Sequence, residues 1–432
     1  MEHAVVLFTQ DLRLHDHPAL TAALRDGRRV LPVFVLDPVL LGRSARNRVR
    51  ALPGILRGLR GDLRARGGDL VVRRGDTAAE VAALAAEAGA RTVHLTEGVS
   101  RAAAQREERL RAAGLHVVSH PGLTVVPPGD VTPAGGDHYK VFTPYLRAWE
   151  AHPWRAVLPA PGAVPVPGGV DPGEIPARLD EGRGEAAERP ITLGEEAARR
   201  RLRAWLDGGL AHYAQRHDDL PAGATSHLSA DLRMGCLSAL EAATLARDEP
   251  GGAEFVRQLA WRDFHHQVTA AFPDIAVRDY RPRGTRWRDD PAALEAWKEG
   301  RTGVPIVDAG MRQLLSEGFM HNRTRMITAA FLTRTLGIHW RAGAGHFADH
   351  LLDGDVANNH GNWQWVAGTG NDTRPNRAFN PLRQARRFDP EGVYVRRYVP
   401  ELAGLPGRAA HTPWDSPRPG ADYPPPIASP GS

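Results

Sequence analysis

Side chains able to do chemistry gather in four segments of the C-terminal half of the chain. The first, residues 225–229, brings three hydroxyl groups into five residues ahead of a helical pattern. Hydroxyl groups and free backbone N–H groups at the start of a helix either cap that helix or bind an anion such as a phosphate. Taken alone, the segment favours the cap over the anion site.

The second and third segments combine arginine with aromatic, amide and thioether side chains. Trp261 and Arg262 are neighbours in an apolar helical pattern, where an arginine is either a surface side chain or a phosphate ligand. In the third segment Asn322 and Arg325 are three residues apart, and Met326 follows directly. This spacing places Asn322 and Arg325 on one face of a helix.

The fourth segment, residues 353–365, is the most polar of the four. Two aspartates flank a glycine, asparagines follow, and Trp363 and Trp365 close the segment. The pattern is not typical of a core helix and predicts a polar pocket with aromatic walls. The alternative is a calcium-binding loop, but the glutamate that completes an EF-hand is missing at the required spacing.

These segments must be positioned by two different parts of the chain. In about the first 120 residues, β-branched runs alternate with helical patterns, which is typical of a parallel sheet covered by helices. The predicted strands are 5–8, 30–36, 70–72, 92–95 and 116–118, and the predicted helices between them are 18–25, 46–66, 77–88 and 101–113.

Beyond residue 190 the strand signal disappears. The predicted helices there are 195–207, 235–247, 253–271, 291–299, 307–317, 322–336 and 345–352. The stretch between the two parts is rich in Pro and Gly at 159–172 and predicts a linker with a short helix at 144–150. We therefore expect an α/β domain (1–125), a linker (126–190), an all-α domain (191–405) and a frayed Pro-rich tail (406–432).

Composition narrows the class of protein. The 432 residues are 42% hydrophobic and 24% charged, as in ordinary globular proteins, and the net charge of +5 permits an anionic partner such as DNA. The single cysteine, Cys236, excludes a disulfide within the chain, and the histidine pairs lack metal-ligand spacing, so no metal is predicted. No signal peptide or membrane span is predicted, so we expect a cytoplasmic protein.

The four segments, together with residues 8–16, 140–145 and 303–311, occur in the order found in the photolyase/cryptochrome family. The resemblance runs from Val5 to about Pro426. Within this family the chain is most similar to class I cyclobutane pyrimidine dimer photolyases of high-GC bacteria. The resemblance implies a Rossmann-like α/β domain with a parallel sheet, joined to a larger all-α domain that binds FAD.

The resemblance also implies which residues contact FAD. Around its phosphates it places Tyr213, Thr225, Ser226, Leu228, Ser229 and Arg262. Around the flavin and the ribose it places Arg325, Asp353, Asp355 and Asn359, with Arg325 paired to Asp353. A guanidinium beside the flavin is physically sensible, because it stabilises the anionic reduced form that is active in this family.

Three tryptophans match the family's path for electrons from the surface to the flavin: Trp287, Trp340 and Trp363. The residues that the resemblance places at the substrate are Gln258, Trp261, Asn322, Arg323, Met326, Trp365 and Arg377. Asn322 and Met326 match enzymes for cyclobutane dimers, whereas (6-4) photoproduct enzymes carry two histidines there. Gln258 departs from the glutamate usual in dimer photolyases.

The implied function is light-driven repair of pyrimidine dimers in UV-damaged DNA, by electron transfer from excited reduced FAD. The alternatives are a cryptochrome-type light receptor, which Gln258 favours slightly, and (6-4) photoproduct repair. A second antenna chromophore is expected to be a deazaflavin, with which Asp37 and Arg48 are compatible. Ser100 and Arg101 replace the Asn-Glu pair of methenyltetrahydrofolate-binding relatives. We expect a monomer that does not act at a membrane.

Overall fold

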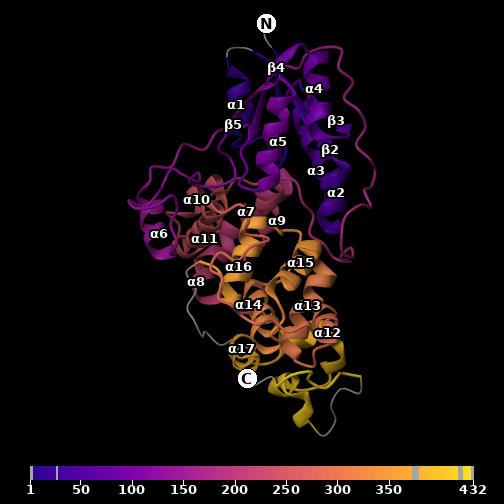
Figure 1. Cartoon of the computed structure of the whole chain (residues 1–432), viewed down its shortest axis with the longest axis vertical. Helices are drawn as coiled ribbons and strands as arrows, with labels where there is room; N and C mark the ends of the chain where they lie inside the picture. The colour runs from indigo at the N-terminus through magenta and orange to yellow at the C-terminus, as the bar shows by residue number, and fades with distance from the viewer. Residues whose placement is uncertain (1–2, 26–27, 372–378, 417–421, 430–432) are drawn as a thin grey trace. The chain divides into compact units, whose positions relative to one another are not determined.

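The computed structural model describes residues 3–25, 28–371, 379–416 and 422–429 (Figure 1). The chain forms two compact units, and each is described by itself. Unit 1 comprises Met1–Arg183, Thr192–Ala211 and Ser226–Asp274, and unit 2 comprises Gly184–Ile191, His212–Thr225 and Ile275–Ser432. Among the described residues, no helix has both the length and the apolar character needed to cross a bilayer.

Unit 1 contains the predicted parallel sheet, with strand order β3-β2-β1-β4-β5. The strands are β1 (His3–Leu7), β2 (Arg29–Leu36), β3 (Val71–Arg74), β4 (Ala90–Thr96) and β5 (His116–His120). In the central strand, Val5 pairs with Leu31 on one side and with Val93 on the other. The α/β prediction is confirmed, and each strand end lies within three residues of its predicted position.

Helices follow the strands of unit 1 as predicted (Figure 1). They are α1 (Pro18–Ala23), α2 (Pro38–Arg43), α3 (Arg46–Arg64), α4 (Thr77–Glu87) and α5 (Arg101–Ala112). Asp37, Asp76 and Ser100 accept backbone N–H groups at the starts of α2, α4 and α5, so local capping sets these boundaries. Of these five helices, only α2 had no counterpart in the sequence prediction.

The rest of unit 1 is helical or irregular. Its helices are α6 (Phe142–Ala151), α7 (Glu195–Ala204), α9 (Ser229–Met234), α10 (Ala239–Ala246) and α11 (Gly252–Ala271). Residues 152–183 are all described and form no helix or strand, as the Pro/Gly content predicts. They are nevertheless fixed to the sheet, since Val30 N donates to Pro165 O and Val72 N to Pro172 O at 2.9 and 2.8 Å.

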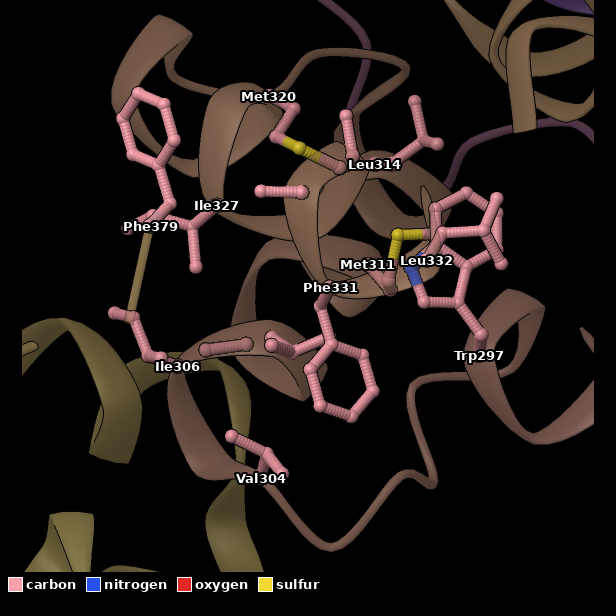
Figure 2. Close-up of a cluster of buried hydrophobic side chains, with 14 of the residues drawn as sticks. Trp297, Val304, Ile306, Met311, Leu314, Met320, Ile327, Phe331, Leu332 and Phe379 are labelled. Carbon is pink, nitrogen blue, oxygen red and sulfur yellow. The ribbon is translucent and has the colours of Figure 1, made fainter. Parts of the chain in front are cut away.

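Unit 2 is helical among its described residues. Its helices are α8 (Tyr213–Arg216), α12 (Pro291–Lys298), α13 (Pro305–Glu317), α14 (Asn322–Ala330), α15 (Trp340–His350), α16 (Val356–Ala367), α17 (Pro381–Phe388) and α18 (Val393–Tyr398). Trp297, Met311, Leu314 and Phe331 lie in its hydrophobic core and are fully buried (Figure 2). This core supports α14, which begins at Asn322.

Helix α16 corrects one expectation. The sequence 353–365 was interpreted as unlike a core helix, yet Val356–Ala367 is helical. Asp355 caps it by accepting the Asn358 backbone N–H at 2.8 Å, and Gly368 ends it in a left-handed conformation. Its polar residues do not follow the usual amphipathic pattern, because Asn358 and Asn359 line a pocket and Gln364 is buried.

The Pro-rich tail is the second correction. The expected fraying is wrong for its described residues, which contain the short helical turns Gly407–His411 and Pro413–Asp415. Further along, Ile427 N donates to Thr302 O at 2.9 Å, and the Tyr423 hydroxyl donates to Asp308 Oδ2 at 2.5 Å. Burial raises the pKa of Asp308, so its donors matter for stability.

Tyr423→Phe is expected to lower the free energy of unfolding by about 1–3 kcal/mol, because a buried carboxylate loses a donor. Thermal melting monitored by circular dichroism should show a midpoint several degrees lower. Tyr139→Phe in unit 1 is the matched control and should melt as the wild type does. Equal midpoints for both variants would mean that the tail does not stabilise unit 2.

Candidate functional site

A pocket in unit 2 is lined by α14, by α15 and the loop after it, and by α16. Its lining includes Asn322, Arg325 and Met326 of α14. The remaining lining residues are Ala329, Phe347, Leu351, Asp353, Gly354, Asn358, Asn359, Asn362, Trp363, Trp365 and Val366. The third and fourth polar segments of the sequence therefore meet in one concave site, as the prediction of a polar pocket with aromatic walls requires.

A charge pair dominates the polar side of this pocket. Arg325 Nη1 and Nη2 donate to Asp353 Oδ1 and Oδ2 at 3.1 and 2.8 Å. Arg325 Nε donates to Met320 O at 2.7 Å, so the guanidinium is fixed from two sides. Such a bidentate pair has a defined plane and orientation. It presents a positive charge that a planar anionic ring system can use.

Two predicted cofactor residues, Asp355 at the cap of α16 and Asn359 within it, form hydrogen bonds with other groups of the protein. Asp355 accepts the backbone N–H and the side-chain amide of Asn358 at 2.8 and 2.7 Å. Asn359 Nδ2 donates to Ala344 O at 2.9 Å, which fixes the amide relative to α15. Of the two, Asn359 lines the pocket. Asp355 acts in this structure as the helix cap, a role that the sequence prediction did not include.

The aromatic side of the pocket is formed by Trp363 and Trp365. Trp363 is almost fully buried, with its ring edge-on to Phe347 at 5.0 Å between ring centres. Space for it depends on Gly343, where a Cβ would lie 2.1 Å from the Trp363 ring. Trp365 lies edge-on to Phe379 at 6.4 Å. Tight packing therefore fixes Trp363.

The other two tryptophans of the predicted electron path lie close to one histidine. The His339 ring centre is 4.9 Å from that of Trp287 and 5.7 Å from that of Trp340. Trp340 is fully buried, whereas Trp287 is half-buried. Trp340 Nε1 donates to Asp279 Oδ1 at 2.9 Å. Burial lowers the pKa of His339, and the Arg341 charge lowers it further, so its ring is neutral at neutral pH.

The predicted substrate and phosphate residues of unit 1 lie on α11. Trp261 stacks on the buried Phe142 ring, with 3.6 Å between centres and 8° between planes. Arg262 Nη1 donates to Leu123 O at 2.6 Å. Gln258 Nε2 lies 3.5 Å from Glu254 Oε1, at the outer limit of a hydrogen bond. Trp261 is thus rigidly backed, while Gln258 is loosely held.

The hydroxyl segment at 225–229 does not cap α9 through a side chain. The residue that precedes the helix is Leu228, and no side-chain cap hydrogen bond forms there among the described residues, so the simple cap interpretation is wrong. Ser226 Oγ instead accepts Leu228 N at 3.4 Å, and Ser229 begins the helix. Thr225 Oγ1, in unit 2, is buried without a hydrogen-bond partner among the described residues.

The remaining predicted residues lie in unit 2. The Tyr213 ring lies 5.3 Å from that of His217. Arg323 forms an ion pair with Asp218 and covers the Phe388 ring at 4.3 Å. Its guanidinium is therefore already engaged, which the prediction of a phosphate contact did not foresee. Arg377 lies outside the described residues.

Comparison with known proteins decides the family. Sequence models described as "DNA photolyase" and "FAD binding domain of DNA photolyase" match residues 4–165 and 255–430. A deoxyribodipyrimidine photo-lyase from Streptomyces griseus is 52% identical, with 99% of this chain and 96% of the relative covered. The chain belongs to the DNA photolyase family. A photo-lyase from Escherichia coli is 35% identical over 98% of this chain and 95% of the relative.

Solved photolyase-family structures share the whole architecture. A class III photolyase from Agrobacterium tumefaciens superposes with a TM-score of 0.89 at 33% identity, covering 99% of this chain and 95% of the other. A cryptochrome from Synechocystis gives a TM-score of 0.91 at 29% identity, covering 99% and 97%. The predicted two-part photolyase fold is therefore confirmed, although both repair enzymes and a cryptochrome share it.

The unit 2 residues fit the FAD of the photolyase family. The Arg325–Asp353 pair offers charge and hydrogen-bond capacity at the pocket, and the asparagines of α16 add amide groups. The partnerless hydroxyl of Thr225 has unused capacity of the kind that a phosphate oxygen can take up. Individual FAD contacts, including those predicted for Ser226, Leu228, Ser229 and Arg262, stay predictions.

Sequence reasoning missed the partners of the predicted residues. Asp279 holds Trp340, Asp218 holds Arg323, and Phe142 backs Trp261. No sequence signal identifies these three residues as partners, because each pairing joins residues far apart in the chain. Phe142 lies in the segment 140–145 used for the family resemblance, but its stacking role is visible only in the structure.

Proposed function

We propose that this photolyase repairs cyclobutane pyrimidine dimers in DNA in a light-driven reaction with bound reduced FAD. One observation supports it above all: Asn322, Met326 and Trp365 lie in one pocket with the Arg325–Asp353 pair. The amide and the thioether match dimer-repairing relatives. No histidine lines this pocket among the described residues, whereas the (6-4) alternative would place histidines at 322 and 326.

When bound, reduced FAD supplies the electron that light transfers to the dimer and that returns after the ring opens. The protein positions the reactants and sets the charge around them. Arg325, oriented by Asp353, supplies positive charge beside the flavin, and Asn359 supplies a neutral amide without an acidic proton. Asn322 donates or accepts hydrogen bonds at the base edge, and Trp365 provides an apolar wall for a base flipped from the duplex.

The predicted electron path serves a different purpose, the reduction of FAD before repair. Trp363 lines the pocket, Trp340 is fully buried, and Trp287 is half-buried. His339 lies against both outer tryptophans and is neutral, so it adds no charge that would oppose removal of an electron from either indole.

Asp279→Asn is expected to slow light-driven flavin reduction about threefold to tenfold, equal to roughly 0.7–1.4 kcal/mol of lost stabilisation. The Asp279 carboxylate accepts the Trp340 N–H and stabilises positive charge on that indole. Flavin absorbance followed under blue light with a thiol donor measures the rate. Asp289→Asn, an exposed residue close to Trp287 in sequence, is the matched control. Equal rates in both variants would contradict this role of Asp279.

The experiment that tests the proposed function uses an oligonucleotide with one thymine dimer and the reduced holoprotein. Restoration of intact thymines is expected under blue light and not in the dark. A flavin that is photoreduced while the dimer persists would instead support the cryptochrome alternative. That alternative has two observations in its favour, Gln258 and the similarity to a Synechocystis cryptochrome.

The second chromophore, location and assembly also stay proposals. We infer a deazaflavin antenna, a cytoplasmic monomer, and UV-damaged DNA as the partner. One structural neighbour is an archaeal photolyase from Sulfolobus tokodaii whose published description reports two FAD molecules and a novel light-harvesting cofactor. Chromophores extracted from the purified protein and identified by mass spectrometry would decide between a deazaflavin, a second FAD and no antenna.

A further inference from the structure

Arg323 is the only residue of the segment 322–326 whose charge is paired with a carboxylate outside the pocket. Its Nε donates to Asp218 Oδ1 at 3.1 Å, and its Nη2 donates to the second carboxylate oxygen. The guanidinium lies 4.3 Å from the centre of the Phe388 ring. The Arg323 and Asp218 side chains are 18% and 24% exposed, so an anion from solvent can still reach the pair.

The loop that carries Asp218 is firmly attached within unit 2. Leu220 N donates to Phe388 O at 3.2 Å, and Arg397 Nη2 donates to Pro221 O at 3.2 Å. Phe388 thus contacts both the loop and Arg323. The carboxylate is therefore held beside the guanidinium by the fold and is not a mobile surface side chain that happens to meet it.

We propose that Asp218 is a specificity-determining residue that restrains Arg323 from binding undamaged DNA. A phosphate at Arg323 must replace a carboxylate that already occupies the guanidinium fork. Phosphate contacts dominate the binding of DNA that does not depend on sequence or damage. When Asp218 occupies the Arg323 guanidinium, the affinity for undamaged DNA is therefore lowered more than the affinity for damaged DNA. The proposal rests on the proposed function, because it takes DNA as the substrate.

A dimer bound in the pocket can offset the cost of replacing Asp218 by a DNA phosphate, because Arg323 adjoins the pocket. Its chain neighbour Asn322 and, one turn on, Met326 line the pocket proposed for the flipped dimer. A dimer held there would fix the flanking phosphate close to α14, so that phosphate competes with Asp218 at high local concentration. Undamaged DNA lacks this anchor and must displace the carboxylate from free solution.

The test compares Asp218→Asn with Asp219→Asn in the full-length holoprotein. Both variants remove one negative charge from the same loop, but Asp219 approaches Arg216, at 3.7 Å, and not Arg323. The probes are a fluorescent duplex with one thymine dimer and the same duplex undamaged, titrated in the dark at several salt concentrations. Asp218→Glu keeps the carboxylate and serves as the rescue variant.

Asp218→Asn is expected to bind the undamaged duplex about fivefold to tenfold more tightly, with a salt dependence steeper by about one ion, and the damaged duplex less than about twofold more tightly. Asp219→Asn should change both affinities by the same small factor, and Asp218→Glu should match the wild type. Weaker binding of both duplexes by Asp218→Asn, or identity with Asp219→Asn, would overturn the proposal. A wild-type protein that neither prefers the damaged duplex nor repairs it would refute the proposed function instead.

Discussion

Asp353→Ala is expected to give a protein that retains less than about one tenth of the wild-type flavin after purification, since each 1.4 kcal/mol changes affinity about tenfold. The variant removes the carboxylate that receives both terminal nitrogens of Arg325. Removing one partner of a partly buried pair costs about 3–5 kcal/mol when the remaining charge is left without compensation. That cost acts directly on the pocket, because both residues line it.

The ratio of flavin to protein absorbance in the purified protein measures this effect, and titration with added FAD gives the change in affinity. Asp353→Asn keeps an acceptor without the charge and should fall between the alanine variant and the wild type. Asp349→Ala, on α15 of the same unit, is the matched control and should keep its flavin. Wild-type flavin content in Asp353→Ala would show that the pair does not organise the cofactor site.

The sheet of unit 1 could be predicted because its signals are local. Strands β1 and β2 consist almost wholly of buried apolar residues, as expected of a parallel sheet covered on both faces. The helix starts are marked by capping residues such as Asp76 and Ser100, which act within three residues of their own position. The periodicity of the hydrophobic residues and the capping residues can both be recognised within short stretches of the chain.

Helix α16 and the tail show where local signals mislead. The asparagines of α16 line the pocket that this helix forms with α14 and α15, so the pattern of α16 alone resembles a loop. In the tail, prolines suggest disorder, but the bond from Tyr423 to Asp308 spans 115 residues of sequence. A composition cannot reveal a partner so far away.

In the candidate site, too, some residues could be predicted from the sequence and others could not. Residue types and motif order identified Arg325, Asp353 and Trp363, and the structure places all three at one pocket. The carboxylates that accept hydrogen bonds from Arg323 and Trp340 were beyond sequence reasoning, because Asp218 and Asp279 lie 105 and 61 residues from these side chains. Sequence motifs therefore named residues that line the pocket, while their distant partners required the folded chain.

Trp363→Phe is expected to slow light-driven flavin reduction by about tenfold or more, the factor that each 1.4 kcal/mol added to a barrier produces. A phenyl ring gives up an electron far less readily than an indole does, and Trp363 is the member of the predicted path that borders the pocket. The substitution keeps an aromatic ring in the space provided by Gly343 and against Phe347, so the pocket should survive.

Repair by protein that has been reduced chemically separates the electron path from the repair site. Trp363→Phe reduced with dithionite should repair a thymine dimer within about twofold of the wild type, because the path prepares FAD and takes no part in ring opening. Trp297→Phe removes an equally buried indole whose centre is 6.0 Å from that of Trp363, and should keep normal photoreduction. If chemically reduced Trp363→Phe fails to repair, this tryptophan acts in the binding of cofactor or lesion. If its photoreduction is unchanged, electrons reach the flavin by a route that does not include Trp363.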